Sequence, residues 1–196
     1  MNRHLITGAF AAAALVASAP AFSQAYVGAG LGVNHAGRPC GSVDATGASF
    51  GCDKNEAAVK VTGGYQLPGT PWAAELTYSD LGRFKGSTAD SSATIKGQYW
   101  GLGGAYRPDF GNGWGGVARI GEAYGQSKLR YDLAGAIGSQ THDDWHPYYG
   151  LGLTYSLTKQ VKLEADWDNT RLTTRAPTGA STTTVNSFTL GANYAF

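Results

Sequence analysis

Apolar side chains occupy every second position along most of this 196-residue chain. The stretch 149–157, YGLGLTYSL, has an aromatic or aliphatic residue at each odd position, with glycine, threonine or serine between them. Successive side chains of a β-strand point to opposite faces, so a period of two predicts strands with one apolar and one polar face. No stretch after the first 25 residues holds the period of an α-helix. The chain is therefore predicted to be all-β.

Eight stretches carry this alternation, and each is about 9–13 residues long. Ordinary strands have about 5–6 residues, whereas a tilted strand needs about 9–11 residues to cross a bilayer. Their length therefore favours strands that span a membrane. The eight are 25–35, 57–67, 72–80, 98–107, 114–126, 145–157, 161–169 and 187–196.

The connections between these stretches alternate between long and short. The short ones are rich in turn residues and the long ones in glycine, serine and threonine. This rhythm is typical of an up-and-down barrel with short turns at one end and long loops at the other. We therefore predict an eight-stranded antiparallel up-and-down transmembrane β-barrel. The short connections are 68–71, 108–113 and 158–160, and the long ones 36–56, 81–93, 127–144 and 170–184.

A period of two also fits a soluble lipocalin-like barrel, whose apolar face points inward around a ligand. Charged residues make up only 15% of the chain, yet they gather on the polar faces of the strands, between glycines. A membrane barrel would place both signs of charge in a narrow lumen, where they must pair. We predict an interior ion-pair network there, with a polar-lined pore as the alternative. Its residues are Lys60, Glu75, Arg119, Lys162, Glu164, Asp166 and Asp168.

Aromatic residues cluster at the ends of the apolar faces, as expected for girdles at the two bilayer interfaces. They are Tyr26, Trp72, Tyr78, Trp100, Tyr106, Trp114, Trp145, Trp167 and Tyr194. One stretch, 114–126, is irregular because Glu122 shares a face with Ile120 and Tyr124. Either Glu122 lies at an interface or a β-bulge resets the register.

The first segment has a basic residue, Arg3, then an apolar run and small residues, which predicts a secretory signal peptide. A membrane-anchoring helix is disfavoured because the run is shorter than about 20 residues. We expect residues 1–23 to be removed, with cleavage as late as 25 also fitting, and 24–196 to form the barrel domain.

Loss of Arg3 leaves 15 − 1 = 14 basic residues against 14 acidic ones. This balance argues against a nucleic-acid partner.

Export also bears on the two cysteines, Cys40 and Cys52, which lie in the first predicted long loop. A pair of cysteines in an exported protein suggests a disulfide, here closing a loop of about a dozen residues. Such a bridge is worth roughly 3 kcal/mol in the chain-entropy model. A metal site is the alternative, but no histidines stand at ligand spacing beside them.

The segment AYVGAGLGVNH, followed by AAVKVTGGYQLPGTPWAAELTYSDLG and the closing FTLGANYAF, resembles the OmpA-like transmembrane domain and related small outer-membrane β-barrels. The resemblance implies the outer membrane of a Gram-negative bacterium, with outer-membrane lipid and lipopolysaccharide around the barrel. It also implies that the barrel-assembly machinery reads the last strand, with Tyr194 and Phe196 as the signal. No peptidoglycan-binding domain is expected to follow.

Some barrels of this kind modify lipid A, and the deacylase type needs a serine two residues after a histidine. Neither His35, His142 nor His146 has one. His142, Asp144 and His146 share one strand face, so a metal or proton-transfer site is conceivable, but a polar loop rim is favoured. We expect no cofactor and no bound metal.

The predicted function is therefore non-enzymatic. It combines envelope integrity with surface loops that contact host, phage or other ligands. One alternative is a narrow channel or a route for small or hydrophobic solutes. The other is a soluble periplasmic ligand-binding barrel.

Overall fold

The computed structural model describes residues 24–37, 51–52, 55–87, 91–133, 136–176 and 179–196. The predicted signal peptide, residues 1–23, lies outside them, and so does Cys40. Among the described residues, no helix is long and apolar enough to cross a membrane.

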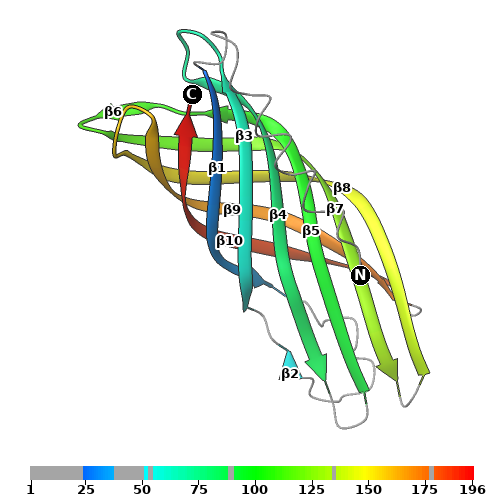
Figure 1. The fold of residues 1–196 in the computed structure, drawn as a ribbon. Coiled ribbons are helices and arrows are strands. Elements are labelled where there is room, and N and C mark those ends of the chain that lie inside the picture. The colour runs from blue at the N-terminus through cyan, green and yellow to red at the C-terminus, as the bar shows by residue number, and fades with distance from the viewer. Residues whose placement is uncertain (1–23, 38–50, 53–54, 88–90, 134–135, 177–178) are drawn as a thin grey trace, which may run out of the picture.

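Eight long antiparallel strands form one closed barrel (Figure 1). They are β1 (Ala25–Ala36), β3 (Asn55–Gln66), β4 (Trp72–Ser87), β5 (Ser91–Tyr106), β7 (Trp114–Leu133), β8 (Ala136–Ser156), β9 (Val161–Ala176) and β10 (Gly179–Ala195). Each pairs with the next along the chain, and β1 pairs with β10 to close the barrel. Two short strands, β2 (Gly51–Cys52) and β6 (Asp109–Gly111), lie beside β4 and β7. The predicted barrel is confirmed.

The two ends of the barrel differ. At one end, which we call the turn end, short connections join β3 to β4, β5 to β7 and β8 to β9. Phe196 also lies there, where its backbone N–H donates to the carbonyl of Ala25 at 3.0 Å. At the other end, which we call the hairpin end, β4–β5, β7–β8 and β9–β10 end in pairs, and the first two pairs extend furthest (Figure 1).

Three of the four predicted long loops are wrong, because most of their residues continue the strands. The β4–β5 pair extends to Ser87 and Ser92, and the β7–β8 pair to Leu133 and Ala136. The β9–β10 pair extends likewise to its last residues. In these stretches apolar residues such as Phe84, Leu129 and Leu172 face inward and the outward positions are largely polar, so outward apolar residues no longer mark the strands. The predicted loops concerned are 81–93, 127–144 and 170–184.

The apolar face of the barrel points outward. Leu31 is 68% exposed, Ile120 71% and Leu190 66%. A soluble barrel would bury these side chains around a ligand, so this orientation excludes that alternative. Glu122 also points outward, and the pairing on both sides of it is unbroken. The irregularity in β7 is thus an outward carboxylate, and no bulge resets the register.

Aromatic side chains meet across neighbouring strands on this outward face. Tyr78, Trp100, Tyr124 and Trp145 pair in unbroken register across β4, β5, β7 and β8 on the side of the hairpin end. We call these four residues the aromatic row. The Tyr78 and Trp100 rings lie 4.9 Å apart, and those of Tyr124 and Trp145 5.3 Å. Tyr26 departs from the predicted girdle, because it is buried inside the barrel.

Candidate functional site

The interior of the barrel holds a group of paired charges in the half nearer the turn end, which we call the ion-pair layer. Four strands contribute to it, and most of its side chains are buried. Eight strands leave an interior just wide enough for side chains to fill, so these groups are forced together. The layer consists of Lys60 on β3, Glu75 on β4, Arg107 just after β5, Arg119 on β7, and Glu164, Asp166 and Asp168 on β9.

Arg119 lies at the centre of the layer and contacts three carboxylates. Its Nε donates to Glu75 Oε2 at 2.5 Å, and its Nη1 donates to Asp166 Oδ1 at 2.7 Å. Its Nη2 donates to Glu164 Oε1. Arg119 is 3% exposed and Glu75 1%, so these charged hydrogen bonds form out of contact with bulk water. The planar guanidinium can hold several carboxylates at once because it presents five donors in a fixed geometry.

Arg107 belongs to this layer and Tyr26 on β1 contacts it, although the sequence analysis placed neither of them there. Arg107 donates to Glu75 Oε1 at 2.8 Å and to Glu164 Oε2 at 2.6 Å. The Tyr26 hydroxyl donates to Glu75 Oε1, and the Arg107 guanidinium lies 4.8 Å above the Tyr26 ring. Asn193 on β10 donates to Glu164 at 2.7 Å. The layer therefore links β1, β3, β4, β7, β9 and β10 across the lumen.

Lys60 binds the remaining carboxylates of the layer. Its Nζ lies 3.0 Å from Asp166 Oδ2 and 2.5 Å from Asp168 Oδ2. Three cations thus face four carboxylates, which leaves a formal charge of 3 − 4 = −1. Among the described residues, Asp168 Oδ1 is a buried oxygen with no hydrogen-bond partner.

Lys162 lies outside the ion-pair layer. It is exposed, and no ion pair within the described ranges includes it. It occupies the second position of β9, at the turn end, on the same strand face as Glu164. A flexible lysine at the mouth of a barrel can extend its ammonium into water. Lys162 therefore lies on the polar face of β9 without joining the ion-pair layer.

Glycines on the interior face make room for these side chains. A Cβ at Gly64 would lie 2.1 Å from the Tyr26 ring, and one at Gly152 would lie 2.2 Å from Asp166 Oδ1. Both distances are far below van der Waals contact, so these positions require the absence of a side chain. The glycines at these two positions therefore reflect a lumen crowded by the side chains of Tyr26 and Asp166.

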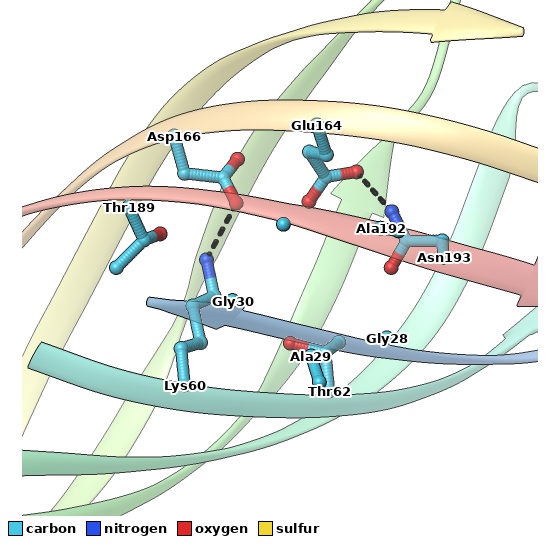
Figure 2. Close-up of a pocket in the computed structure, with 11 residues that line it drawn as sticks. Gly28, Ala29, Gly30, Lys60, Thr62, Glu164, Asp166, Thr189, Ala192 and Asn193 are labelled. Carbon is cyan, nitrogen blue, oxygen red and sulfur yellow. Dashed lines mark hydrogen bonds and ion pairs between the residues drawn. The ribbon is translucent and has the colours of Figure 1, made fainter. Parts of the chain in front are cut away.

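The ion-pair layer leaves little free space. A cavity of about 10 Å³ remains beside it, lined by Lys60, Thr62, Glu164, Asp166 and Asn193 among others (Figure 2). A single water molecule needs about this much volume. Figure 2 shows Lys60 reaching across this space from β3 to Asp166 on β9.

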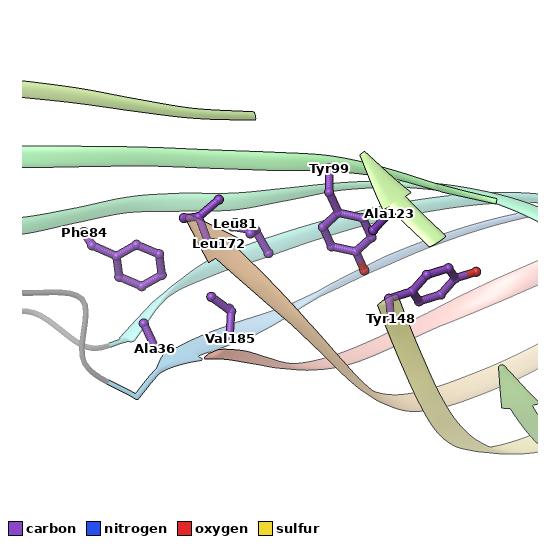
Figure 3. Packing of buried hydrophobic residues seen from close by; sticks show 8 residues of the cluster. All are labelled: Ala36, Leu81, Phe84, Tyr99, Ala123, Tyr148, Leu172 and Val185. Carbon is purple, nitrogen blue, oxygen red and sulfur yellow. The ribbon is translucent and has the colours of Figure 1, made fainter. Parts of the chain in front are cut away.

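A second layer, which we call the apolar layer, fills the interior nearer the hairpin end (Figure 3). Gly82, with φ of 80°, marks a β-bulge that shifts the pairing between β4 and β5. Because of this bulge, Leu81 and Phe84 both point inward and are almost fully buried. The layer consists of Ala36, Leu81, Phe84, Tyr99, Ala123, Tyr148, Leu172 and Val185.

At the hairpin end, β9 bends toward the interior of the barrel. The pairing of β8 with β9 ends at Tyr149 and Asn169, although both strands continue. Beyond that point β9 leans against the inner side of β7, where Ser127 Oγ donates to the Thr173 carbonyl at 2.7 Å. Leu172 is buried in the apolar layer. The ion-pair layer, the apolar layer and this part of β9 thus occupy successive levels of the interior.

The residues considered as a metal site, His142, Asp144 and His146, form polar contacts at the rim of the barrel. His146 Nε2 lies 2.7 Å from Asp144 Oδ1 and 3.2 Å from Thr173 Oγ1, and His142 Nε2 lies 3.6 Å from Asp144. The contact between His146 and Thr173 joins β8 to the inward-leaning part of β9. Within the described residues, no group of three or more His, Cys, Asp or Glu is placed to hold a metal ion. The Cys40–Cys52 bridge falls outside the described residues and stays a prediction.

The geometry agrees with known proteins. The profile of the outer membrane protein β-barrel domain matches residues 5–196. Neisserial surface protein A has a TM-score of 0.59 at 16% identity, covering 88% of this chain and 97% of that chain. Ail, the attachment invasion locus protein of Yersinia pestis, scores 0.55 at 15% identity, covering 88% and 98%. A major outer membrane protein from Thermus thermophilus scores 0.53 at 16% identity, covering 88% and 98%.

These structures share the fold of the chain. No curated protein matches the sequence. The predicted location, the outer membrane of a Gram-negative bacterium, is confirmed, and in such barrels the short turns face the periplasm. The hairpin end therefore faces the outside of the cell. The profile match covers nearly the whole sequence, so the chain belongs to the family of outer membrane proteins with this β-barrel domain.

Proposed function

We propose that this protein is a non-enzymatic surface protein whose barrel is sealed and whose hairpin end makes the functional contacts outside the cell. The observation that carries the proposal is the dense packing of buried side chains inside the barrel. The free volume beside the ion-pair layer is about 10 Å³, which is no more than one water molecule occupies. The apolar layer stacks on it toward the hairpin end. A solute would have to break buried ion pairs in order to pass. Breaking such a pair is costly because it leaves a buried charge without a partner.

The hairpin end supports a role in binding. β8 runs nine residues from Trp145 to Ala136 beyond the aromatic row, paired with β7 throughout. With a rise of about 3.3 Å per residue and a tilt near 40°, that length projects roughly 20 Å from the membrane. A paired hairpin is more rigid than a loop. Less conformational entropy is therefore lost when it binds a ligand, and the affinity is higher for the same contacts.

The relatives support the same class of function. One of them is named an attachment invasion locus protein, and a further structure of it, with TM-score 0.53 and 14% identity, is a complex with the heparin analogue sucrose octasulfate. For this chain we propose host or phage ligands at the hairpin end and outer-membrane lipid around the barrel. The barrel-assembly machinery would act at β10, and the sealed barrel would contribute to envelope integrity.

A deletion strain complemented with two forms of the protein tests this proposal. One form is the wild type. The other lacks residues 129–140, with Lys128 and Thr141, which face each other across β7 and β8, joined by a two-residue turn. Both forms should restore resistance to deoxycholate, because both retain the sealed barrel. Only the wild type should restore adhesion to cultured epithelial cells.

The shortened form must first appear as a folded, heat-modifiable band in the outer membrane. Full adhesion by the shortened form would contradict a binding role for the β7–β8 hairpin. Failure of both forms to restore deoxycholate resistance would contradict the envelope role.

A further inference from the structure

Basic side chains gather on the outward face of β4, β5 and β7, between the aromatic row and the tips of the hairpins. Four of the five are exposed and Lys96 is half-buried. This face lies outside the filled interior and takes no part in the ion-pair layer. We call these residues the basic face: Arg83, Lys85, Lys96, Lys128 and Arg130.

The strand register places these cations directly opposite one another. Arg83 pairs with Lys96, and Lys96 pairs with Lys128, so three cations form one row across three strands. The next row toward the tips joins Lys85 and Arg130 through Thr94. Like charges directly opposite in a sheet are destabilising. A row of this kind therefore favours an anion that bridges the strands.

Few carboxylates on the same face offset this charge. Among the described residues, the acids on this outward part of β4, β7 and β8 are Asp80, Asp132 and Asp143. The contact between Lys96 Nζ and Asp80 Oδ2 is long, at 3.9 Å. Asp143 lies at the edge of the row and accepts a hydrogen bond from the Tyr124 hydroxyl at 3.1 Å. Lys96 thus meets a carboxylate only at this distance, and no ion pair among the described residues includes Lys128.

The bulge in β4 creates half of the basic face. Up to Asp80 the even-numbered residues of β4 point outward, and beyond the bulge the odd-numbered residues do. Without this change, Arg83 and Lys85 would point into the barrel. The bulge is fixed by Gly82 at φ 80°, whose N–H donates to Asp80 Oδ1 at 2.9 Å. The local backbone is therefore built to present cations outward, toward the lipid side of the wall.

The height of the basic face matches the headgroups of the outer leaflet. Lys96 and Lys128 each lie four residues beyond the aromatic row, counted from Trp100 and Tyr124. Four residues of a tilted strand rise about 10 Å. Aromatic side chains mark the edge of the hydrocarbon, so these lysines stand in the sugar-phosphate zone just outside it. A soluble ligand would favour the hairpin tips, whereas this face points sideways at neighbouring lipids.

We propose that the basic face is a lateral binding site for the phosphate groups of the outer-leaflet glycolipid. Lysines and arginines attract anionic lipid headgroups close to the surface, and arginine binds phosphate with two parallel hydrogen bonds. The ligand bridges the cation row and relieves its repulsion. This proposal rests on the orientation of the barrel in the membrane. It does not rest on the proposed sealed interior or on the proposed adhesive role.

Native mass spectrometry of the refolded protein in detergent, titrated with diphosphorylated lipid A, tests the proposal. The variant Lys96→Gln with Lys128→Gln removes the two central charges of the row. We expect it to bind roughly thirtyfold more weakly, about 2 kcal/mol, from about 1 kcal/mol for each cation near an anionic headgroup. The matched control, Lys159→Gln with Arg171→Gln, removes two exposed charges elsewhere and should bind like the wild type.

Lipid A from which both phosphates have been removed provides a second measurement on the wild type alone. Its binding should fall to the level of the double variant. Equal binding of the two lipid forms, or equal weakening in the control variant, would overturn the proposal. Loss of heparin binding in the double variant, with lipid A binding unchanged, would instead assign the basic face to a soluble polysaccharide.

Discussion

Arg119 is the residue on which the ion-pair layer depends most. It contacts Glu75, Glu164 and Asp166 at once, and each of these carboxylates is buried. A buried ion pair contributes little net stability when complete, but removal of one partner leaves uncompensated charge. The asymmetry makes Arg119 a sensitive site for testing whether the interior is packed as described.

Replacement of Arg119 by methionine should lower the free energy of unfolding by about 3–5 kcal/mol, because three buried carboxylates lose a partner. Urea titration of the protein refolded in phospholipid vesicles measures this change. Lys162→Met is the matched control, since Lys162 is exposed, and it should change the stability by no more than about 0.5 kcal/mol. Equal losses in the two variants would contradict the layer.

The odd or even position of a residue along its strand, which we call its parity, predicted most of the ion-pair layer. The errors of this prediction lie at the strand ends. Tyr26 has the parity of Gly28 on the interior face, a signal that the aromatic-girdle interpretation overlooked. Arg107 also has interior parity, but it follows the last residue of β5. Lys162 has the same parity and yet extends into water. Parity gives the direction of a side chain, whereas its depth in the barrel depends on strand tilt, which a single sequence does not contain.

At the scale of elements, the bulge in β4 controls two surfaces together. It turns Phe84 into the apolar layer beside Leu81, and it turns Arg83 and Lys85 outward. It also explains an error in the predicted strands. The alternation of the sequence breaks at Leu81, so the strand was expected to end at Asp80, whereas β4 continues to Ser87. A β-bulge adds one residue to a strand and so interrupts the alternation of apolar and polar residues. The alternation alone cannot distinguish such a bulge from the end of a strand.

Gly82→Ala should destabilise the barrel by about 1–3 kcal/mol, because a side chain at positive φ is strained. Its Cβ would also lie 2.7 Å from Glu56 Cβ. The control is Gly63→Ala, where an added Cβ meets nothing within 4 Å. Thermal unfolding in the same detergent compares the two. A Gly82→Ala variant as stable as Gly63→Ala would show that the bulge does not require glycine.

The last strand, β10, provides a test of the predicted assembly signal. Phe196 and Phe188 are both outward aromatics, 41% and 51% exposed. If the barrel-assembly machinery reads the terminal residue, Phe196→Ala should reduce the amount of heat-modifiable barrel in the outer membrane, and Phe188→Ala should reduce it much less. Electrophoresis of unheated outer-membrane fractions measures this amount. Similar yields from the two variants would argue that the chain end carries no special signal.

At the scale of the whole molecule, alternation over eight stretches was enough to predict a closed barrel with its apolar face outward. The inward course of β9 was not predictable in this way. In β9, Asp168, Asn169 and Thr170 are consecutive and all buried, because the strand leaves β8 and bends inward. Hydroxyl and amide residues suit water and a packed polar interior equally well. The sequence RLTTRAPTGASTTT was therefore interpreted as an exposed loop, and only the three-dimensional packing distinguishes the two cases.

The central claim is that the barrel interior is sealed, and single-channel recording of the mature protein in a planar bilayer tests it most directly. This proposal rests on the ion-pair layer, the apolar layer and the inward course of β9, and on the cavity of about 10 Å³ beside the charges. We predict no steady openings for the wild type. Reproducible openings whose size changes in Glu164→Gln or Asp166→Asn would contradict the sealed interior and make those carboxylates the lining of a pore.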